Sequence, residues 1–230
     1  MSKTIVVVGF GSGVSKAVAE RFGAEGYSVA LVARREAPLA EGVRALRAKG
    51  VAAAAFQADA SDAEAIAGAI ERAREELGPI GVIHWNAYSG GEAGDLIAAT
   101  PASVRRVFET PVVGLLAAVQ AALADLKAAG DGAVLVTNGA YGELAPQIDM
   151  LAVSQKAMGL AVGNAAKHKL VGLLSQRLKG DGVFVGEVMI AGAVRGTAAD
   201  TGGPTIDPAA IADKFWELYR ARDAIRARVS

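Results

Sequence analysis

Residues 4–35 read TIVVVGFGSGVSKAVAERFGAEGYSVALVARR, and this stretch decides the fold. A short apolar run is followed by closely spaced glycines, an Ala-rich segment and a second apolar run. Near-continuous Val, Ile and Ala without polar alternation is typical of parallel strands that are covered by helices on both faces. The stretch therefore predicts a strand, a glycine turn, a helix and a second parallel strand, over residues 4–8, 9–13, 14–24 and 28–33.

The same alternation continues along the chain. Apolar runs predict further strands over residues 51–58, 81–85, 133–137 and 183–190, with a last short strand near 225–229. Ala-rich segments predict helices over 37–49 and 62–77, a pair within 102–128, and one long helix over about 149–179. The Asp207–Pro208 pair predicts the start of a final helix that runs to about Ala221, because Asp caps helices and Pro suits the first helical position. Alternating strands and helices predict an α/β fold, a doubly wound parallel sheet of six to seven strands with helices on both faces.

No linker or charge block divides the sequence, so a single domain is expected over residues 1–230. The stretch from Ala191 to Thr205 is rich in Gly, Ala and Thr and predicts a mobile loop over a binding site, at about 191–207.

Composition excludes several classes of protein. The 230 residues contain no Cys, which excludes a disulfide scaffold, a thiol nucleophile and a Cys-based metal centre, and fits a reducing cytoplasm. Lys and Arg number 24 and so do Asp and Glu, with no basic stripe, which argues against a nucleic-acid partner. The longest apolar stretch, 111–124, contains Gln120 and is shorter than the roughly 20 residues that cross a bilayer. We expect a soluble cytoplasmic protein without a membrane segment.

A nucleotide site is expected where the first strand meets the first helix. Glycine turns at this position let a pyrophosphate approach the backbone N–H groups and the positive end of the helix dipole. The spacing here is G-x-x-x-G-x-S rather than G-x-G-x-x-G, and the alternative interpretation is a tight turn without a ligand. The candidate residues of the turn are Gly9, Gly11, Ser12, Gly13 and Val14.

Other candidate residues follow the ends of the predicted strands, the edge at which open α/β sheets bind ligands. Arg34 and Arg35 end the second strand, where an acid would otherwise bind a ribose 2′-hydroxyl, so they favour NADP over NAD. Asp59 ends the third strand, Asn86 follows the fourth in WNAYSG, and Thr197 follows the sixth in AGAVRGT.

In these segments the sequence resembles the short-chain dehydrogenase/reductase family. Residues 9–35 are similar to the family's T-G-x-x-x-G-x-G unit, WNAY to its N-N-A-G segment, and AGAVRGT to its P-G-x-V-x-T loop. The resemblance implies a Rossmann-like fold, adenine binding near Asp59 and Ala60, and a nicotinamide carboxamide near Thr197. The sequence departs from the family's pattern at Val8 and Trp85, among other positions.

The family's catalysis, as the resemblance implies it, uses a tyrosine, a lysine four residues later, a serine and an asparagine. The segment AVSQKAMGL resembles the family's Y-x-A-S-K segment and assigns its lysine to Lys156, but the residue four earlier is Ala152. No Tyr-x-x-x-Lys occurs in the sequence. The serine position reads Gly139 or Ala140, and Pro111 stands for the asparagine. Lys156 alone is retained, so the sequence predicts an atypical member with a degenerate tetrad.

Replacement proton donors are few. Tyr141 follows the fifth predicted strand and is a candidate, and Tyr88 is a weaker one; both have an alternative role as packing aromatics. His84 lies inside an apolar run, so we expect a core histidine with satisfied hydrogen bonds. His168 lies between two lysines, so we expect it on a solvated helix face. Two distant histidines without H-E-x-x-H predict no metal site.

Two functions remain open. The first is an NADP(H)-dependent oxidoreductase that acts on a small carbonyl, alcohol or activated alkene, with Tyr141, water or the substrate as proton donor. The second is a non-catalytic NADP-binding protein that serves as a sensor or partner subunit. The long apolar helices over 111–128 and 149–179, which pair across a two-fold axis in the family, predict a homodimer or homotetramer.

Overall fold

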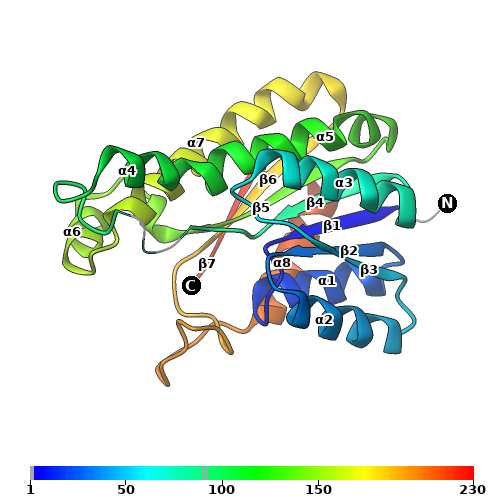
Figure 1. The fold of residues 1–230 in the computed structure, drawn as a ribbon, viewed down its shortest axis with the longest axis horizontal. Coiled ribbons are helices and arrows are strands. Elements are labelled where there is room, and N and C mark those ends of the chain that lie inside the picture. Colours follow the sequence, from blue (N-terminus) through cyan, green and yellow to red (C-terminus); the bar gives the residue numbers. More distant parts are fainter. Residues whose placement is uncertain (1–2, 90, 92) are drawn as a thin grey trace.

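The computed structural model describes residues 3–89, 91 and 93–230. Its centre is one sheet with the strand order β3-β2-β1-β4-β5-β6-β7, and every pair of neighbouring strands is parallel (Figure 1). The strands are β1 (Thr4–Val8), β2 (Ser28–Ala33), β3 (Ala53–Gln57), β4 (Ile80–Trp85), β5 (Ala133–Gly139), β6 (Phe184–Ile190) and β7 (Arg226–Val229). The predicted doubly wound parallel sheet is confirmed, including its short last strand.

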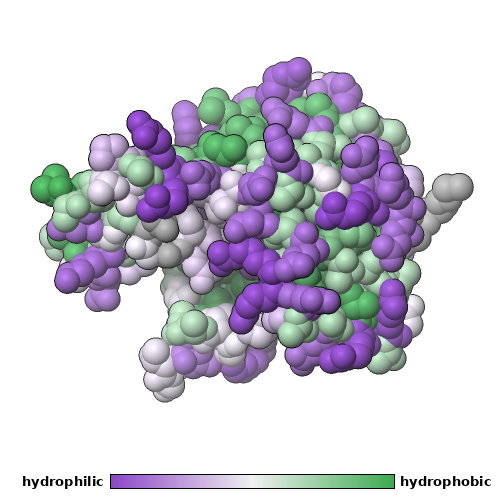
Figure 2. All heavy atoms as spheres, viewed as in Figure 1, coloured by the Kyte–Doolittle hydropathy of each residue, from purple (hydrophilic) through white to green (hydrophobic). Residues whose placement is uncertain are grey.

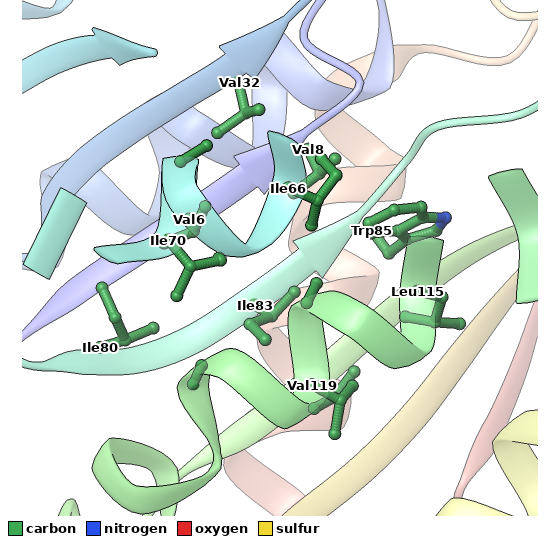
Figure 3. Packing of buried hydrophobic residues seen from close by; sticks show 14 of the residues in the cluster. Val6, Val8, Val32, Ile66, Ile70, Ile80, Ile83, Trp85, Leu115 and Val119 are labelled. Atoms are coloured by element: carbon green, nitrogen blue, oxygen red, sulfur yellow. The ribbon is translucent and has the colours of Figure 1, made fainter. Parts of the chain in front are cut away.

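Helices cover both faces of the sheet. One face carries α1 (Val14–Ala24), α2 (Glu36–Ala48) and α8 (Pro208–Ala221), and the other carries α3 (Ala63–Leu77), α5 (Leu115–Ala128) and α7 (Met158–Leu178) (Figure 1). The central strands β1, β2 and β4 are covered on both faces, so their side chains of both orientations are buried, which is why these strands read as continuous apolar runs. Figure 3 shows one of the two cores, in which α3 and α5 pack on the strands through Ile66, Ile70, Leu115 and Val119 against Val6, Val8, Ile80, Ile83 and Trp85.

Several helix starts follow directly from side chains that cap them. The carboxylate of Asp62 accepts a hydrogen bond from the N–H of Ala65 at the start of α3. Asp207 does the same for Ala209 at the start of α8, with Pro208 in the first turn. The helix predicted from the Asp207–Pro208 pair to about Ala221 is confirmed.

The helical segment over residues 101–128 is continuous but irregular. It consists of α4 (Pro101–Phe108), the π-helical turn η1 (Glu109–Gly114) and α5. Pro111 lies inside η1, and a proline lacks an N–H and clashes with the carbonyl four residues earlier, which explains why the α-helical pattern is interrupted there. Residues 101–128 are long and apolar enough to span a membrane by composition alone, yet α5 packs in the core through Leu115, Ala118 and Ala122.

The long helix predicted over 149–179 is wrong, because the structure divides it. The helix α6 (Pro146–Ser154) ends before α7 begins at Met158. The N–H of Lys156 bonds the carbonyl of Val153, and the N–H of Ala157 bonds that of Ala152, which together form a Schellman end. Lys156 takes the left-handed position of this motif, with φ of 51°, where glycine is usual.

The loop predicted at about 191–207 contains no helix or strand and is closed by a single bridge between Val194 and Ile206. The loop leaves the carboxyl end of β6 and returns to the glycine turn after β1. There the hydroxyl of Ser12 donates a hydrogen bond to the carbonyl of Gly196 over 3.0 Å.

Candidate functional site

The candidate site lies at the carboxyl edge of the sheet, where the strand order reverses. The chain runs outward in one direction through β1, β2 and β3 and in the other through β4, β5, β6 and β7, so β1 and β4 flank the reversal point. Ligands of open α/β sheets bind in the crevice at this point. Figure 2 shows the surface hollowed at this edge, between the end that carries α4 and α6 and the segment that joins β6 to α8.

The glycine turn is fixed by close backbone approaches. Gly9 has φ of +83°, and a Cβ there would lie 2.5 Å from the backbone nitrogen of Ala87, so only glycine fits. The side-chain amide of Asn86 donates to the carbonyl of Gly9 over 3.3 Å. The Ser15 hydroxyl accepts from the N–H of Gly11 over 2.8 Å, which ties the turn to the first turn of α1. Asn86 and the turn, predicted separately, are therefore in contact.

The amino end of α1 is open to a ligand. Gly13 is its N-cap residue and offers no side chain to accept from the first N–H groups of the helix, which begins at Val14. A Cβ at Gly13 would lie 2.5 Å from the Cγ2 of Thr197, so a larger residue would displace the loop. The structure thus brings Ser12, Gly13 and Thr197 together, as a shared nucleotide site requires.

A basic and an acidic residue meet at the ends of β2 and β3. Arg34 is 75% exposed, and its Nη1 lies 4.0 Å from the Oδ2 of Asp59. Burial alone would raise the pKa of the Asp59 carboxyl, but hydrogen bonds from the backbone and hydroxyl of Ser61, with the charge of Arg34, lower it overall. Arg35 is exposed at the start of α2, and Ala60 packs against Gly114 of η1.

The two predicted catalytic residues lie on different elements. Tyr141 lies in η2 (Ala140–Gly142), the turn that directly follows β5 and packs against α7. Lys156 is exposed between α6 and α7, and its carbonyl approaches Gly94, where a Cβ would lie 2.6 Å away. The residue that faces the end of β5 is Asn164, whose Nδ2 lies 3.0 Å from where a Cβ of Gly139 would be.

A buried polar cluster lies directly behind this position. Glu187 on β6 is fully buried, and its Oε1 accepts from the amide of Asn138 over 2.6 Å. Its Oε2 lies 2.7 Å from the Nδ1 of His168 and 3.6 Å from the Nε of Arg226. His168 therefore bonds a buried carboxylate while its side chain stays 30% exposed, so the predicted solvated helix face is only partly right. The signal in the sequence was Glu187 itself, because a charge inside the apolar run VFVGEVMI needs a partner.

Lys167 belongs to the same region and is 2% exposed. Burial lowers its pKa from 10.5 to about 8, although the negative charge of Glu187 opposes this shift. A buried ammonium is rare in proteins and calls for an explanation.

His84 and Trp85 end β4 with unsatisfied nitrogens. The His84 Nε2 lies 3.1 Å from the Thr137 hydroxyl, but the Nδ1 of His84 and the Nε1 of Trp85 have no hydrogen-bond partner in the described part of the chain. Burial lowers the pKa of His84 to about 3, so its ring stays neutral near pH 7. His84 is a core histidine as predicted, but only one of its two nitrogens is satisfied. Among residues 3–89, 91 and 93–230, no group of three or more His, Cys, Asp or Glu side chains could hold a metal ion.

Comparison with known proteins identifies the class. Residues 3–176 match the family described as short chain dehydrogenase, so the chain belongs to this family. It is 33% identical over 131 residues to 3-dehydrosphinganine reductase TSC10A of Arabidopsis thaliana, a match that covers 56% of this chain and 39% of that protein. It is 31% identical over 123 residues to a diacetyl reductase of Staphylococcus epidermidis, covering 53% of this chain and 47% of that one. The aligned segments thus span less than half of these curated relatives.

Solved structures agree with the fold. L-sorbose reductase of Gluconobacter frateurii, complexed with NADPH and L-sorbose, superposes with a TM-score of 0.85 at 21% identity, covering 100% of this chain and 95% of that one. A metagenomic short-chain oxidoreductase in complex with NADP gives a TM-score of 0.79 at 22% identity, covering 99% and 96%. At such identities the likeness establishes the fold alone.

Proposed function

We propose that this chain is an atypical NADP(H)-dependent oxidoreductase of the short-chain type, which acts on a small carbonyl, alcohol or activated alkene with a non-standard proton donor. The observation that carries the proposal is the uncapped amino end of α1 beside the glycine turn, with the exposed Arg34 at the next strand end. A free helix N-terminus and a nearby arginine fit a pyrophosphate and a 2′-phosphate, respectively. The NADP and NADPH complexes of the structural neighbours support the same cofactor.

Different residues of the chain would bind different parts of the cofactor. The turn and the first helical turn hold the pyrophosphate, Arg34 and Arg35 the 2′-phosphate, and Asp59 with Ala60 the adenine. Asn86 and Thr197 would hold the nicotinamide half of NADPH, which supplies a hydride when it is bound. The residues of the turn in this assignment are Gly9, Gly11, Ser12, Gly13 and Val14. Lys156 toward the nicotinamide ribose and Tyr141 as a proton donor stay predictions.

Cofactor preference tests this assignment. Arg34→Asp replaces a cation that would face the 2′-phosphate, so we expect the affinity for NADPH to fall about 10- to 100-fold, while that for NADH changes little. Arg44→Asp, the same charge change on the exposed face of α2, is the matched control. Affinities follow from the enhancement of nicotinamide fluorescence on binding. Equal losses for both cofactors would contradict the NADP assignment.

A second function, a non-catalytic NADP-binding sensor or partner subunit, is favoured by the absence of any Tyr-x-x-x-Lys in the sequence. Absorbance at the NADPH band, followed with a panel of quinones, diketones and aldehydes, distinguishes the two functions. Tight NADPH binding without turnover of any compound would favour the second.

We also propose a cytoplasmic homodimer or homotetramer that pairs through residues 111–128 and 149–179, which include α5 and α7. Val113, Val162 and Leu173 are exposed on η1 and α7, and a shallow depression on α5 is lined by Gln120, Leu123, Ala124 and Lys127. Apolar side chains and a depression on adjacent helices suit a self-complementary contact. Light scattering tests this, and a monomer would contradict it. The absence of Cys supports the cytoplasmic location.

A further inference from the structure

Large apolar side chains are exposed at the end of the molecule that carries α4 and α6 (Figure 1). Their exposed fractions run from 44% at Leu151 to 92% at Ile97. Single apolar residues scattered over a surface need no explanation, but a gathered group of them marks a binding surface. We call this group the apolar end, and it consists of Tyr88, Ile97, Leu144, Met150, Leu151 and Val153.

The helix α6 turns an apolar stripe toward solvent. Pro146, Met150 and Val153 are four and three positions apart, so they lie along one side of the helix, and all three are exposed. The helix packs against η2 and α7, and Ala152 is its buried residue. A surface helix normally turns its apolar stripe toward the core. The outward stripe of α6 therefore indicates that a ligand or partner covers it.

Two segments of the chain form the apolar end, and both start at the candidate cleft. Tyr88 lies two residues beyond Asn86, whose amide donates to the carbonyl of Gly9 in the glycine turn. Leu144 lies two residues beyond η2, the turn that follows β5 and contains Tyr141. Because β4 and β5 are neighbours in the sheet, the two segments leave its carboxyl edge side by side.

The same two segments meet again where α6 ends. The N–H of Met158 donates to the carbonyl of Gly94 over 3.2 Å. A Cβ at Gly94 would lie 2.6 Å from the carbonyl oxygen of Lys156. Ile97 follows Gly94 by three residues, so it lies within about 11 Å of this contact. The apolar end thus begins at the cleft and continues to the carboxyl end of α6.

We propose that the apolar end binds the hydrocarbon part of this chain's substrate, which is therefore a carbonyl or alcohol compound with an apolar chain or ring system. The inference deepens the proposed function and rests on it. The reacting carbon lies at the nicotinamide, beside Asn86, and the hydrocarbon part extends from there along Tyr88 and α6. Binding sites for small molecules are lined mainly by apolar and aromatic side chains, with a few polar groups that fix orientation.

Two other occupants fit the apolar end less well. A helix that lies on a bilayer carries Lys and Arg on its polar face. The helix α6 contains no Lys or Arg, and its charged residue is Asp149. A second copy of the chain would normally contact about 20–30 residues on each side. The short α6 and residues 93–97 provide fewer than that.

The test is the binding of methyl ketones, from butanone to octanone, to the NADP⁺ complex of the chain, measured by isothermal titration calorimetry. Full burial of a methylene strengthens binding about fourfold. We therefore expect the affinity to rise about two- to fourfold with each added methylene. In assays with NADPH, KM should fall along the same series while kcat changes little, because the contact is equally strong in the ground state and the transition state.

Variants at exposed positions locate the contact without disturbing the core. Met150→Gln and Leu144→Gln should each lower the ratio of octanone affinity to butanone affinity about fivefold or more. Leu173→Gln is the matched control, because Leu173 is 56% exposed on α7 and lies about 22 Å along the helix from Met158. This control should leave the affinity ratio unchanged.

The opposite results are distinct. An affinity that does not rise with chain length in wild type, or an affinity ratio that neither Met150→Gln nor Leu144→Gln lowers, would overturn the inference. Light scattering and flotation with phosphatidylcholine vesicles test the other occupants. Dissociation of oligomers in Met150→Gln would assign the apolar end to a second copy, and vesicle binding that this variant abolishes would assign it to a bilayer. Either result would overturn the inference.

Calorimetry also separates this inference from the proposed function. Ketone binding that strengthens with chain length, but without turnover of any ketone, would support the apolar site while rejecting the oxidoreductase activity. Loss of NADPH binding in wild type would overturn the proposed function itself, and the inference with it.

Discussion

Replacing Lys167 by Met should stabilise the protein. The ammonium is held in a site where its pKa is about 8 rather than 10.5, and this value already includes the attraction of Glu187. Because one pH unit of pKa difference corresponds to about 1.4 kcal/mol, keeping the charged form buried at pH 7 costs about 3 kcal/mol of unfolding free energy. Met is apolar, has a similar length and adapts to irregular space, so the variant avoids this cost.

The effect depends on pH in a defined direction. The folded-state pKa of Lys167 is depressed, so between about pH 8 and 10.5 the unfolded chain binds more protons than the folded one. Wild type therefore gains stability as the pH rises through this window, whereas below it the cost is present in full. Lys167→Met lacks this gain, so its advantage of about 3 kcal/mol at pH 7 should vanish near pH 10.5.

Urea denaturation at pH 7 and at pH 10 measures this difference, with Lys169→Met as the exposed control. In a thermal scan at pH 7, the same increment should raise Tm by roughly 6–12 °C for a domain of this size. A variant that is less stable than wild type at pH 7, or an advantage that does not change with pH, would show that the ammonium is solvated or paired, and would refute the reasoning.

Three further variants test other parts of the structure. Gly114→Ala places a Cβ 2.0 Å from the carbonyl oxygen of Ala60, so it should lower the unfolding free energy by about 3 kcal/mol in urea melts; a neutral effect would mean that η1 shifts freely. Glu187→Gln removes the negative charge that attracts the buried Lys167 and should also lower the unfolding free energy by about 3 kcal/mol, and an unchanged value would contradict that attraction. Lys156→Gly relieves the left-handed backbone and should add about 1 kcal/mol, and destabilisation would contradict the Schellman end of α6.

The sheet was predictable because its strands are buried on both faces. The central strands β1, β2 and β4 read as almost unbroken apolar runs, and the carboxylates of Asp62 and Asp207 cap the helices α3 and α8 at the starts that the sequence marks. The nucleotide half of the site was predictable for a similar reason. Its determinants are glycines whose roles follow from the local backbone, such as Gly9 with φ of +83°.

The break between α6 and α7 was not predictable from local sequence. The segment AVSQKAMG contains no proline, and its only glycine lies beyond the break. The interruption comes from tertiary contacts, because the N–H groups of Met158 and Gly159 bond the carbonyls of Gly94 and Ala93 instead of the preceding turn. Lys156, to which the resemblance to a Y-x-A-S-K segment points, is therefore exposed and takes the left-handed position at this break.

The carboxyl edge of the sheet has a nucleotide half and a second half beside α7, and different kinds of chemical group form them. Their functions are therefore separate. The nucleotide half depends on backbone groups and on the absence of side chains, at Gly9 and Gly13 above all. The other half depends on side chains of α7 and β6, held by the bonds of Asn138. Substitution of Lys167 by Met should therefore change the unfolding free energy while the backbone of the glycine turn stays as it is. A buried cation that lowers stability, where a leucine would raise it, is expected to persist only where function requires it.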